Sequence, residues 1–222
     1  MATIYANSTD GSTGATTSDW DGLHDSNRGK NAYFTDAHRD NAVETSLVSG
    51  DLTCYRVFMS FDTSGISVAP TSATLKVYGK ANGTGDIILV KSTQASTDIL
   101  AYNDLEGWTS GYDDGDLTAY SSEISTWSTS GYNDITLNAT ALSDMASLST
   151  LSIAILNHTY DYQDTAPPGD PLIEQNGMYF TQETGTDKDP YIDYTAASEF
   201  VSAPFTIDSG ILTVNGGVLT VE

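Results

Sequence analysis

The sequence predicts an all-β protein: a jelly-roll-like antiparallel β-sandwich with a short C-terminal β-repeat extension. Three observations lead to this fold class. Short stretches of apolar residues alternate with polar ones, the stretches between them are rich in Gly, Ser, Thr, Asn and Asp, and no long helical repeat is present. A chain of 222 residues is also long enough to bury a hydrophobic core without disulfide bonds.

The clearest strand covers residues 54–62 and organises the rest of the prediction. Its residues alternate between two faces, with Tyr55, Val57, Met59 and Phe61 on one and Arg56, Phe58, Ser60 and Asp62 on the other. The first face is apolar and must lie on a core, while the second is at least half covered. Cys54, the single cysteine, cannot form an internal disulfide and is expected to be a small core residue.

The remaining elements follow in chain order. We expect a short strand at 2–6, a long loop at 7–31, weak strand and loop at 32–52, and a strand at 72–80 as the partner of 54–62. A doubly apolar and therefore central strand is expected at 86–91, with helical turns at 98–106 and 117–124. Further strands are expected at 135–138, within 148–157, at 177–181 and at 190–194, with a long polar loop at 158–170. Asn138 is positioned to cap a short helix over residues 139–145. The predicted division is an N-terminal region packed on the sandwich (1–52), a core sandwich (53–196) and an assembly tail (197–222).

The tail contains a seven-residue repeat. Residues 206–212 and 213–219 both follow the pattern Thr-(Ile/Val)-(Asp/Asn)-x-Gly-(Ile/Val)-Leu, which is typical of very short strands joined by tight turns. Two and a half units cannot bury their apolar side chains alone, so we expect contacts with another chain, with a trimer favoured. The predicted assembly residues are Ile207, Ile211, Leu212, Val214, Val218 and Leu219.

Charge and composition restrict the classes of partner. Thirty acidic residues against eight Lys and Arg give a net charge of -22, which repels phosphate and argues against nucleic-acid binding. No apolar run approaches 18 residues, so we expect no membrane span. The first residues have neither a basic nor an apolar leader region, which predicts synthesis in the cytoplasm without a signal peptide.

Four sequence blocks carry a resemblance. They are Arg-Val-Phe-Met-Ser-Phe-Asp-Thr-Ser at 56–64, Ser-Ala-Thr-Leu-Lys-Val-Tyr-Gly at 72–79, Phe-Thr-Gln-Glu at 180–183 and Pro-Tyr-Ile-Asp-Tyr at 190–194. Together they resemble the DNRLRE-type domain, a family related to β-sandwich carbohydrate-binding modules. The resemblance implies the same sandwich fold, and it implies that Arg56 and Glu183 meet across neighbouring strands as a structural ion pair.

A second resemblance concerns the biological setting. The leaderless start, together with Trp-Ser-Thr-Ser-Gly-Tyr-Asn at 127–133 and Thr-Gly-Thr-x-Lys-Asp-Pro-Tyr at 184–191, is similar to structural proteins of tailed bacteriophages, especially marine ones. This implies a virion component. The leading prediction is therefore a non-enzymatic structural protein on the surface of a phage particle, either a capsid decoration or head fibre that contacts the major capsid protein, or a part of the tail.

The alternative prediction is a carbohydrate- or receptor-binding module. Two similar passages place a tryptophan shortly before a Gly-Tyr pair, which suggests two loops at one end of the sandwich. Their aromatic residues either anchor the loops or stack on sugar rings of a cell-surface glycan. The residues concerned are Trp108, Tyr112, Trp127 and Tyr132.

Metal and catalytic motifs are sparse. Asp113, Asp114 and Asp116 form the best Ca²⁺ candidate, because hard cations prefer several carboxylates on a tight turn, and the loop with Asp161, Asp164 and Asp170 is a weaker one. The three histidines His24, His38 and His158 have no neighbouring ligand at zinc-site spacing, so the sequence predicts no zinc site. No nucleophile elbow or phosphate loop is present, and we expect a protein without enzymatic activity.

Overall fold

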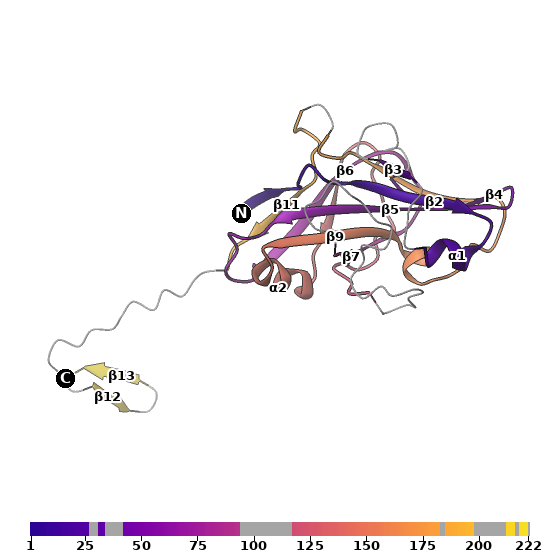
Figure 1. The fold of residues 1–222 in the computed structure, drawn as a ribbon. Helices are drawn as coiled ribbons and strands as arrows, with labels where there is room; N and C mark the ends of the chain where they lie inside the picture. Colours follow the sequence, from indigo (N-terminus) through magenta and orange to yellow (C-terminus); the bar gives the residue numbers. More distant parts are fainter. Residues whose placement is uncertain are drawn as a thin grey trace.

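A computed structural model describes residues 1–26, 31–33, 42–93, 117–182, 185–197, 212–215 and 218–221 (Figure 1). Over these residues the protein is an all-β, sandwich-like fold in which every pair of neighbouring strands is antiparallel. The predicted fold class is therefore confirmed, while the finer jelly-roll arrangement stays a prediction. No helix among the described residues is long and apolar enough to cross a membrane.

The body is one continuous sheet that forms two layers. The first layer has the order β1 (Ala2–Tyr5), β11 (Tyr191–Thr195), β6 (Ser72–Gly83) and β8 (Tyr132–Thr136). The second has the order β3 (Asn31–Tyr33), β2 (Gly11–Thr17), β5 (Asp51–Asp62), β9 (Thr150–Asn157) and β7 (Ile87–Lys91). Two further strands, β4 (Val43–Val48) and β10 (Leu172–Met178), connect the layers, because β4 pairs with β5 while β10 pairs with both β4 and β6.

The main core lies between the two layers. It contains Val57, Met59 and Phe61 of β5 together with Leu75 and Val77 of β6, all fully buried. The strands β5 and β6 are thus not hydrogen-bonded partners, as the sequence had suggested, but contribute to one core from opposite layers. The second face of β5 is buried as well, which the pattern of its residues had indicated.

Helix α2 (Ala139–Ser147) covers one side of this core. Its Ala141 and Met145 are fully buried in the core, while Thr140, Ser143 and Ser147 are exposed. The Asn138 side chain accepts a hydrogen bond from the Ala141 N–H at 3.0 Å, which confirms the predicted N-cap.

The outer face of β5 is covered by two short helical turns. Cys54 packs with Trp20 and Leu23 of α1 (Trp20–His24) and with Tyr160 of η2 (His158–Tyr162), a turn of π-helix. Cys54 is therefore a buried core residue, as predicted. The loop predicted at 158–170 accordingly begins with a helical turn.

Arg56 joins both turns to β5. Its guanidinium donates two hydrogen bonds to the Asp161 carboxylate, from Nε at 2.9 Å and from Nη2 at 2.7 Å, and Nη2 also donates to the His24 carbonyl at 3.2 Å. The side chains of Arg56 and Asp161 are fully buried. The acidic partner seen here is thus Asp161; the predicted partner, Glu183, lies outside the described residues, and that pairing stays a prediction.

Two other expectations differ from the structure. Residues 7–31 were expected to be a loop, yet they contain β2 and α1. Strand β2 has almost no apolar side chains, and its Gly14 is required by packing, since a Cβ there would lie 2.3 Å from the Cys54 carbonyl oxygen. The expected helical turn at 117–124 is extended chain, bridged to β7 through Ala119 and Ile124. The expected turn at 98–106 lies outside the described residues.

The C-terminal repeat forms a separate two-stranded sheet (yellow in Figure 1). Strand β12 (Leu212–Asn215) pairs with β13 (Val218–Val221), so that Val214 lies opposite Leu219 and Asn215 opposite Val218. The very short strands predicted from the repeat are confirmed, while the predicted tight turn between them lies outside the described residues.

A buried carboxyl group lies where the chain turns from β1 into β2. Asp10 is fully buried, and its carboxylate accepts hydrogen bonds from the Thr181 N–H at 2.9 Å and from the Thr181 hydroxyl. Burial raises the pKa of Asp10 from 3.8 to about 7, although the two bonds from Thr181 oppose the shift.

We predict that removing one partner of the Arg56–Asp161 pair is costly. Asp161→Asn removes the carboxylate charge to which the buried guanidinium is hydrogen-bonded and should lower the free energy of unfolding by roughly 3–5 kcal/mol in urea titrations. In a double-mutant cycle with Arg56→Met, the double variant should lose much less than the sum of the single losses. Asp134→Asn, which breaks the exposed pair of Lys76 and Asp134, is the control and should cost about 0–1 kcal/mol. Strictly additive losses would contradict a coupled buried pair.

Asp10 predicts a specific pH dependence. Because the folded state holds this proton more tightly than the unfolded chain, its contribution is fully present below pH 3.8 and is lost as the pH rises towards about 7. In Asp10→Asn the amide oxygen can accept from the Thr181 N–H and the amide NH₂ can donate to the Thr181 hydroxyl oxygen, and the side chain has no proton to lose. The variant should therefore gain stability relative to the wild type between pH 4 and 7, by a few kcal/mol at about 1.4 kcal/mol per pKa unit. A difference that does not change with pH would refute the assignment.

Candidate functional site

The structure brings Trp127 and Tyr132 together at one groove. The groove has a volume of about 420 Å³ and runs between the extended segment 124–128 and strand β8. Its lining is a mixture of aromatic, aliphatic and hydrogen-bonding groups, contributed by Ile124, Thr126, Trp127, Ser128, Tyr132, Asn133, Asp134 and Ile135. Two of the four aromatic residues predicted to contact sugars therefore line the same surface.

Glycines allow the loop that carries Trp127 to approach β6 closely. A Cβ on Gly79 would lie 1.8 Å from the Ser128 carbonyl oxygen, and a Cβ on Gly83 would lie 3.1 Å from the Trp127 ring. The Gly79 N–H donates to the Gly131 carbonyl at 2.9 Å. A larger residue at Gly79 would push the loop away from the sheet and change the shape of the groove.

The buried amide of Asn133 fixes this loop internally. Its Oδ1 accepts from the Ser128 N–H at 2.7 Å, while its Nδ2 donates to the Ser128 carbonyl at 3.0 Å and to the Val77 carbonyl at 3.3 Å. Asn133 thus replaces backbone pairing where the chain enters β8, and these bonds fix the conformation of the groove wall.

Trp127 has two roles in this arrangement. Its indole Nε1–H donates to the Gly177 carbonyl at 3.1 Å, and part of its ring packs against the main core. The ring is only half buried, however, and its remaining surface lines the groove. Trp127 is therefore a loop anchor, as one interpretation of the sequence held, and it also offers an aromatic surface to solvent.

Tyr132 connects the groove to a row of tyrosines on the outer face of the first layer. Neighbouring ring centroids are 5.1–5.6 Å apart, with tilted or edge-to-face contacts. We call these five residues the tyrosine row; in order they are Tyr5, Tyr191, Tyr132, Tyr78 and Tyr179. The register explains the row, because Tyr5 pairs with Tyr191 and Tyr78 pairs with Tyr132 across adjacent strands.

Basic side chains lie on and beside the tyrosine row. Lys188 Nζ lies 4.1 Å from the Tyr179 ring centroid, and Lys80 Nζ lies 5.5 Å from the same centroid. Lys76 projects from the same face of β6 and donates to both Asp134 carboxylate oxygens at 2.7 Å. In a chain of net charge -22, this face thus presents ammonium groups and a carboxylate beside aromatic rings.

Tyr132 and Lys76 on this face both have raised pKa values. Burial raises the pKa of Tyr132 to about 12, with further contributions from Tyr191 and Asp189. The hydrogen bond to Asp134 raises the pKa of Lys76. Tyr132 is consequently a neutral hydroxyl and Lys76 a cation at neutral pH, so both donate hydrogen bonds.

The groove continues past Asp134. A neighbouring hollow of about 380 Å³ shares Ile124, Asp134 and Ile135 with it and extends along the other end of the segment, past Ser121 and Glu123. The combined surface is long and open, a shape suited to an extended polar ligand.

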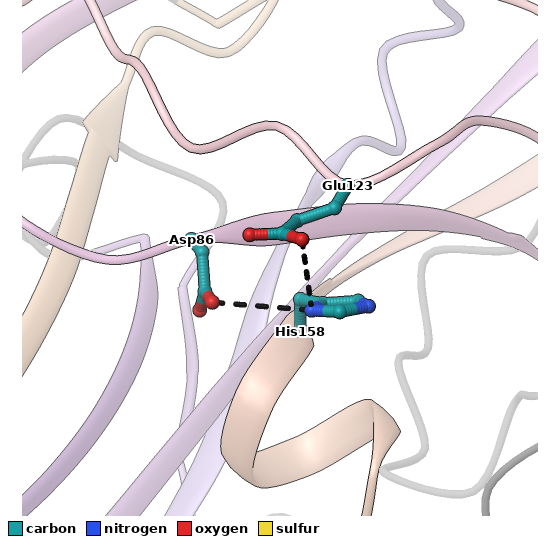
Figure 2. A group of neighbouring side chains, drawn as sticks. All are labelled: Asp86, Glu123 and His158. Atoms are coloured by element: carbon teal, nitrogen blue, oxygen red, sulfur yellow. Dashed lines mark ion pairs between the residues drawn. The ribbon is translucent and has the colours of Figure 1, made fainter.

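A separate cluster of possible metal ligands is formed by Asp86, Glu123 and His158 (Figure 2). His158 Nδ1 faces both carboxylates, at 3.9 Å from Asp86 Oδ2 and 3.8 Å from Glu123 Oε2. The sequence pattern missed this cluster because its members come from three distant segments. The prediction that no zinc site exists considered only ligands close in sequence.

The carboxylates of the weaker Ca²⁺ candidate bind different protein donors. Asp161 is engaged by Arg56, Asp164 accepts from Trp20 Nε1 at 3.0 Å, and Asp170 accepts from the N–H groups of Ser49 and Gly50 at 2.9 and 2.8 Å. Within the described residues these three carboxylates form no common cluster of possible metal ligands. Each of the three carboxylates thus stabilises the fold through its own hydrogen bonds.

Several predicted site residues lie outside the described residues. They are Trp108, Tyr112, Asp113, Asp114, Asp116, Glu183, Ile207 and Ile211. Of the predicted assembly residues, Leu212, Val214, Val218 and Leu219 lie on β12 and β13.

Four members of the tyrosine row were not among the residues predicted from the sequence. The alternation Lys76-x-Tyr78-x-Lys80 on β6 marks an outward face, but only the strand register shows that tyrosines of β1, β8 and β11 extend it. No protein-family model matches the chain, and no curated protein matches it. The resemblance to the DNRLRE-type domain therefore stays a prediction.

Proposed function

We propose that this protein is a non-enzymatic carbohydrate-binding β-sandwich, with the groove between segment 124–128 and β8 as its saccharide site. The observation that carries the proposal is the convergence of Trp127 and Tyr132 on one open groove that continues into the tyrosine row. Aromatic faces pack against the C–H faces of sugar rings, and the polar groups around them determine orientation.

The polar groups of the groove support the same ligand class. Asp134 accepts hydrogen bonds, Lys76 and the hydroxyls of Thr126 and Ser128 donate them, and all four side chains lie at or beside the aromatic surface. A sugar carries both donors and acceptors on one ring, so a mixed set of neutral and charged partners suits it better than a purely apolar ligand. The open shape favours binding to a chain of sugars rather than enclosure of a single small molecule.

A second candidate function is assembly into a larger particle, for which we propose the exterior of a bacteriophage virion. The observation that favours it is the C-terminal hairpin β12–β13, whose strands pair with no strand of the body among the described residues. A hairpin of two four-residue strands is marginally stable alone, so its apolar residues need a covering surface. We propose that equivalent hairpins of three chains provide it and that the sandwich is displayed outward. The two functions are compatible, since a displayed module can bind a host glycan.

Saccharide binding is tested by tryptophan fluorescence with a panel of neutral and acidic oligosaccharides. A binding saccharide should change the emission of the wild type, and Trp127→Phe should remove most of that change. Tyr132→Ala should weaken binding by about 1 kcal/mol, roughly fivefold, because one aromatic contact is lost.

Tyr194→Ala is the matched control, since Tyr194 is a half-buried tyrosine outside the groove and the row. It should bind as the wild type does. The proposal fails if no saccharide of the panel binds, or if Tyr132→Ala retains full affinity.

Assembly is tested by deleting residues 204–222 and measuring the molar mass by light scattering. The full chain should have the mass of a trimer, and the truncated chain that of a monomer with an unchanged β-sheet circular dichroism spectrum. An oligomer that survives the deletion, or a full chain that is monomeric at high concentration, would exclude this role for the hairpin.

A further inference from the structure

We propose that Asp86, Glu123 and His158 form a binding site for a divalent first-row transition metal ion, with Zn²⁺ as the best match. The site is independent of the proposed saccharide binding, because metal binding is measured on the protein alone. It is distinct from the acidic loops that the sequence suggested for Ca²⁺.

Backbone contacts hold the three ligands in place from three remote segments. Ile87 and Ile124 exchange N–H···O bonds of 3.0 and 2.8 Å, which places Glu123 beside Asp86. The His158 N–H donates to the Asp86 carbonyl at 3.0 Å. The positions of the three residues are thus determined by β-sheet-like pairing and do not depend on an ion.

Two of the three side chains are also oriented. The Thr159 hydroxyl donates to Asp86 Oδ2 at 2.6 Å, and the His158 ring stacks on Tyr162 with centroids 5.7 Å apart and planes inclined by 17°. A hydrogen bond of the first kind orients carboxylate ligands in metal sites, and the stacking restrains the plane of the imidazole ring. Both side chains are largely buried, while that of Glu123 is 46% exposed and free to adjust.

The distances between His158 Nδ1 and the two carboxylates fit a shared metal ion better than direct hydrogen-bonded ion pairs. At 3.8 and 3.9 Å, the contacts of Nδ1 with the two carboxylates are too long for hydrogen bonds. Two ligands about 2.1 Å from a tetrahedral Zn²⁺ lie about 3.4 Å apart. The three ligand atoms lie within 4.8 Å of one another, so a closure of up to about 1.4 Å completes the site. Glu123 is the side chain with the freedom to make that movement, because it is 46% exposed.

The ligand types select the metal. An imidazole nitrogen with two carboxylates suits Zn²⁺ and its first-row neighbours, whereas Ca²⁺ prefers an all-oxygen set of six or more ligands. Three protein ligands leave a fourth position for water or another donor. The net charge of -22 further favours cation binding.

Metal binding would have a structural consequence for the groove. Glu123 lies on the segment whose next residues form the groove wall, and it lines the neighbouring hollow itself. An ion shared with Asp86 and His158 would attach this segment to β7 and η2. We therefore expect the bound ion to slow the opening of segment 117–128.

The test is isothermal titration calorimetry of ZnCl₂ into the tag-free full chain after EDTA treatment and dialysis. We expect a Zn²⁺ site that Glu123→Gln and His158→Gln each weaken on the order of tenfold or more, since loss of a direct ligand costs at least as much as loss of an outer contact. Asp51→Asn removes one exposed carboxylate elsewhere and should leave the affinity unchanged.

Other outcomes would overturn the proposal. These are an absence of Zn²⁺ binding at millimolar concentration, wild-type affinity in Glu123→Gln, or displacement of Zn²⁺ by equimolar Ca²⁺. Because Glu123 is exposed, its variant is expected to fold normally, which equal melting temperatures in EDTA would verify. Hydrogen exchange with and without ZnCl₂ should also show slower exchange in segment 117–128 of the wild type and no change in Glu123→Gln.

Discussion

The buried ion pair between Arg56 and Asp161 is the constraint around which the second layer is built. A guanidinium on the outer face of a central strand is tolerated only when its hydrogen-bonding groups are satisfied and its charge is balanced. Asp161 on η2 balances the charge, and the His24 carbonyl at the end of α1 accepts a further bond. One side chain thereby requires two short turns, more than 100 residues apart in sequence, to fold over the same strand. The apolar packing of Trp20, Leu23 and Cys54 completes this cover.

In the second layer, strand β5 is buried on both faces. The first layer, in contrast, has one face on the core and one face exposed to solvent. Its inner side contributes to the shared core, and its outer side carries the tyrosine row, the lysines beside it and the groove at β8. The second layer is buried on both faces of β5 and supports the first layer. We therefore propose that the ligand binds on the outer face of the first layer. The groove is held in shape by strand β8 and by the hydrogen bonds between the Asn133 side chain and the Ser128 backbone. A ligand would therefore bind a surface that is already formed.

The sequence predicted those features that depend on local patterns. Alternation along β5, the doubly apolar β7 and the Asn138 cap are each visible within a few residues, and all three are present in the structure. The central position predicted for β7 is wrong, because β7 ends the second layer and pairs with β9 alone among the named strands. It is still buried, since the extended segment 117–124 bridges its other edge through Ala119 and Ile124. Strand β2 escaped detection because it is held by backbone pairing with β5 and has few apolar side chains of its own. The partner of Arg56, the tyrosine row and the cluster around His158 depend on strand register and on contacts between distant segments, which no local spacing encodes. Trp127 and Tyr132 were found because they lie close together in sequence.

The central claim is that the groove formed by Trp127 and Tyr132 is a saccharide site held on a rigid sandwich. The most direct measurement is an NMR spectrum of protein labelled at its aromatic rings, recorded with the oligosaccharide that changes tryptophan fluorescence most. The account predicts intermolecular nuclear Overhauser effects from sugar C–H protons to the rings of Trp127 and Tyr132, with the core signals of β5 unchanged. Contacts confined to other aromatic residues, with those two rings unaffected, would contradict it.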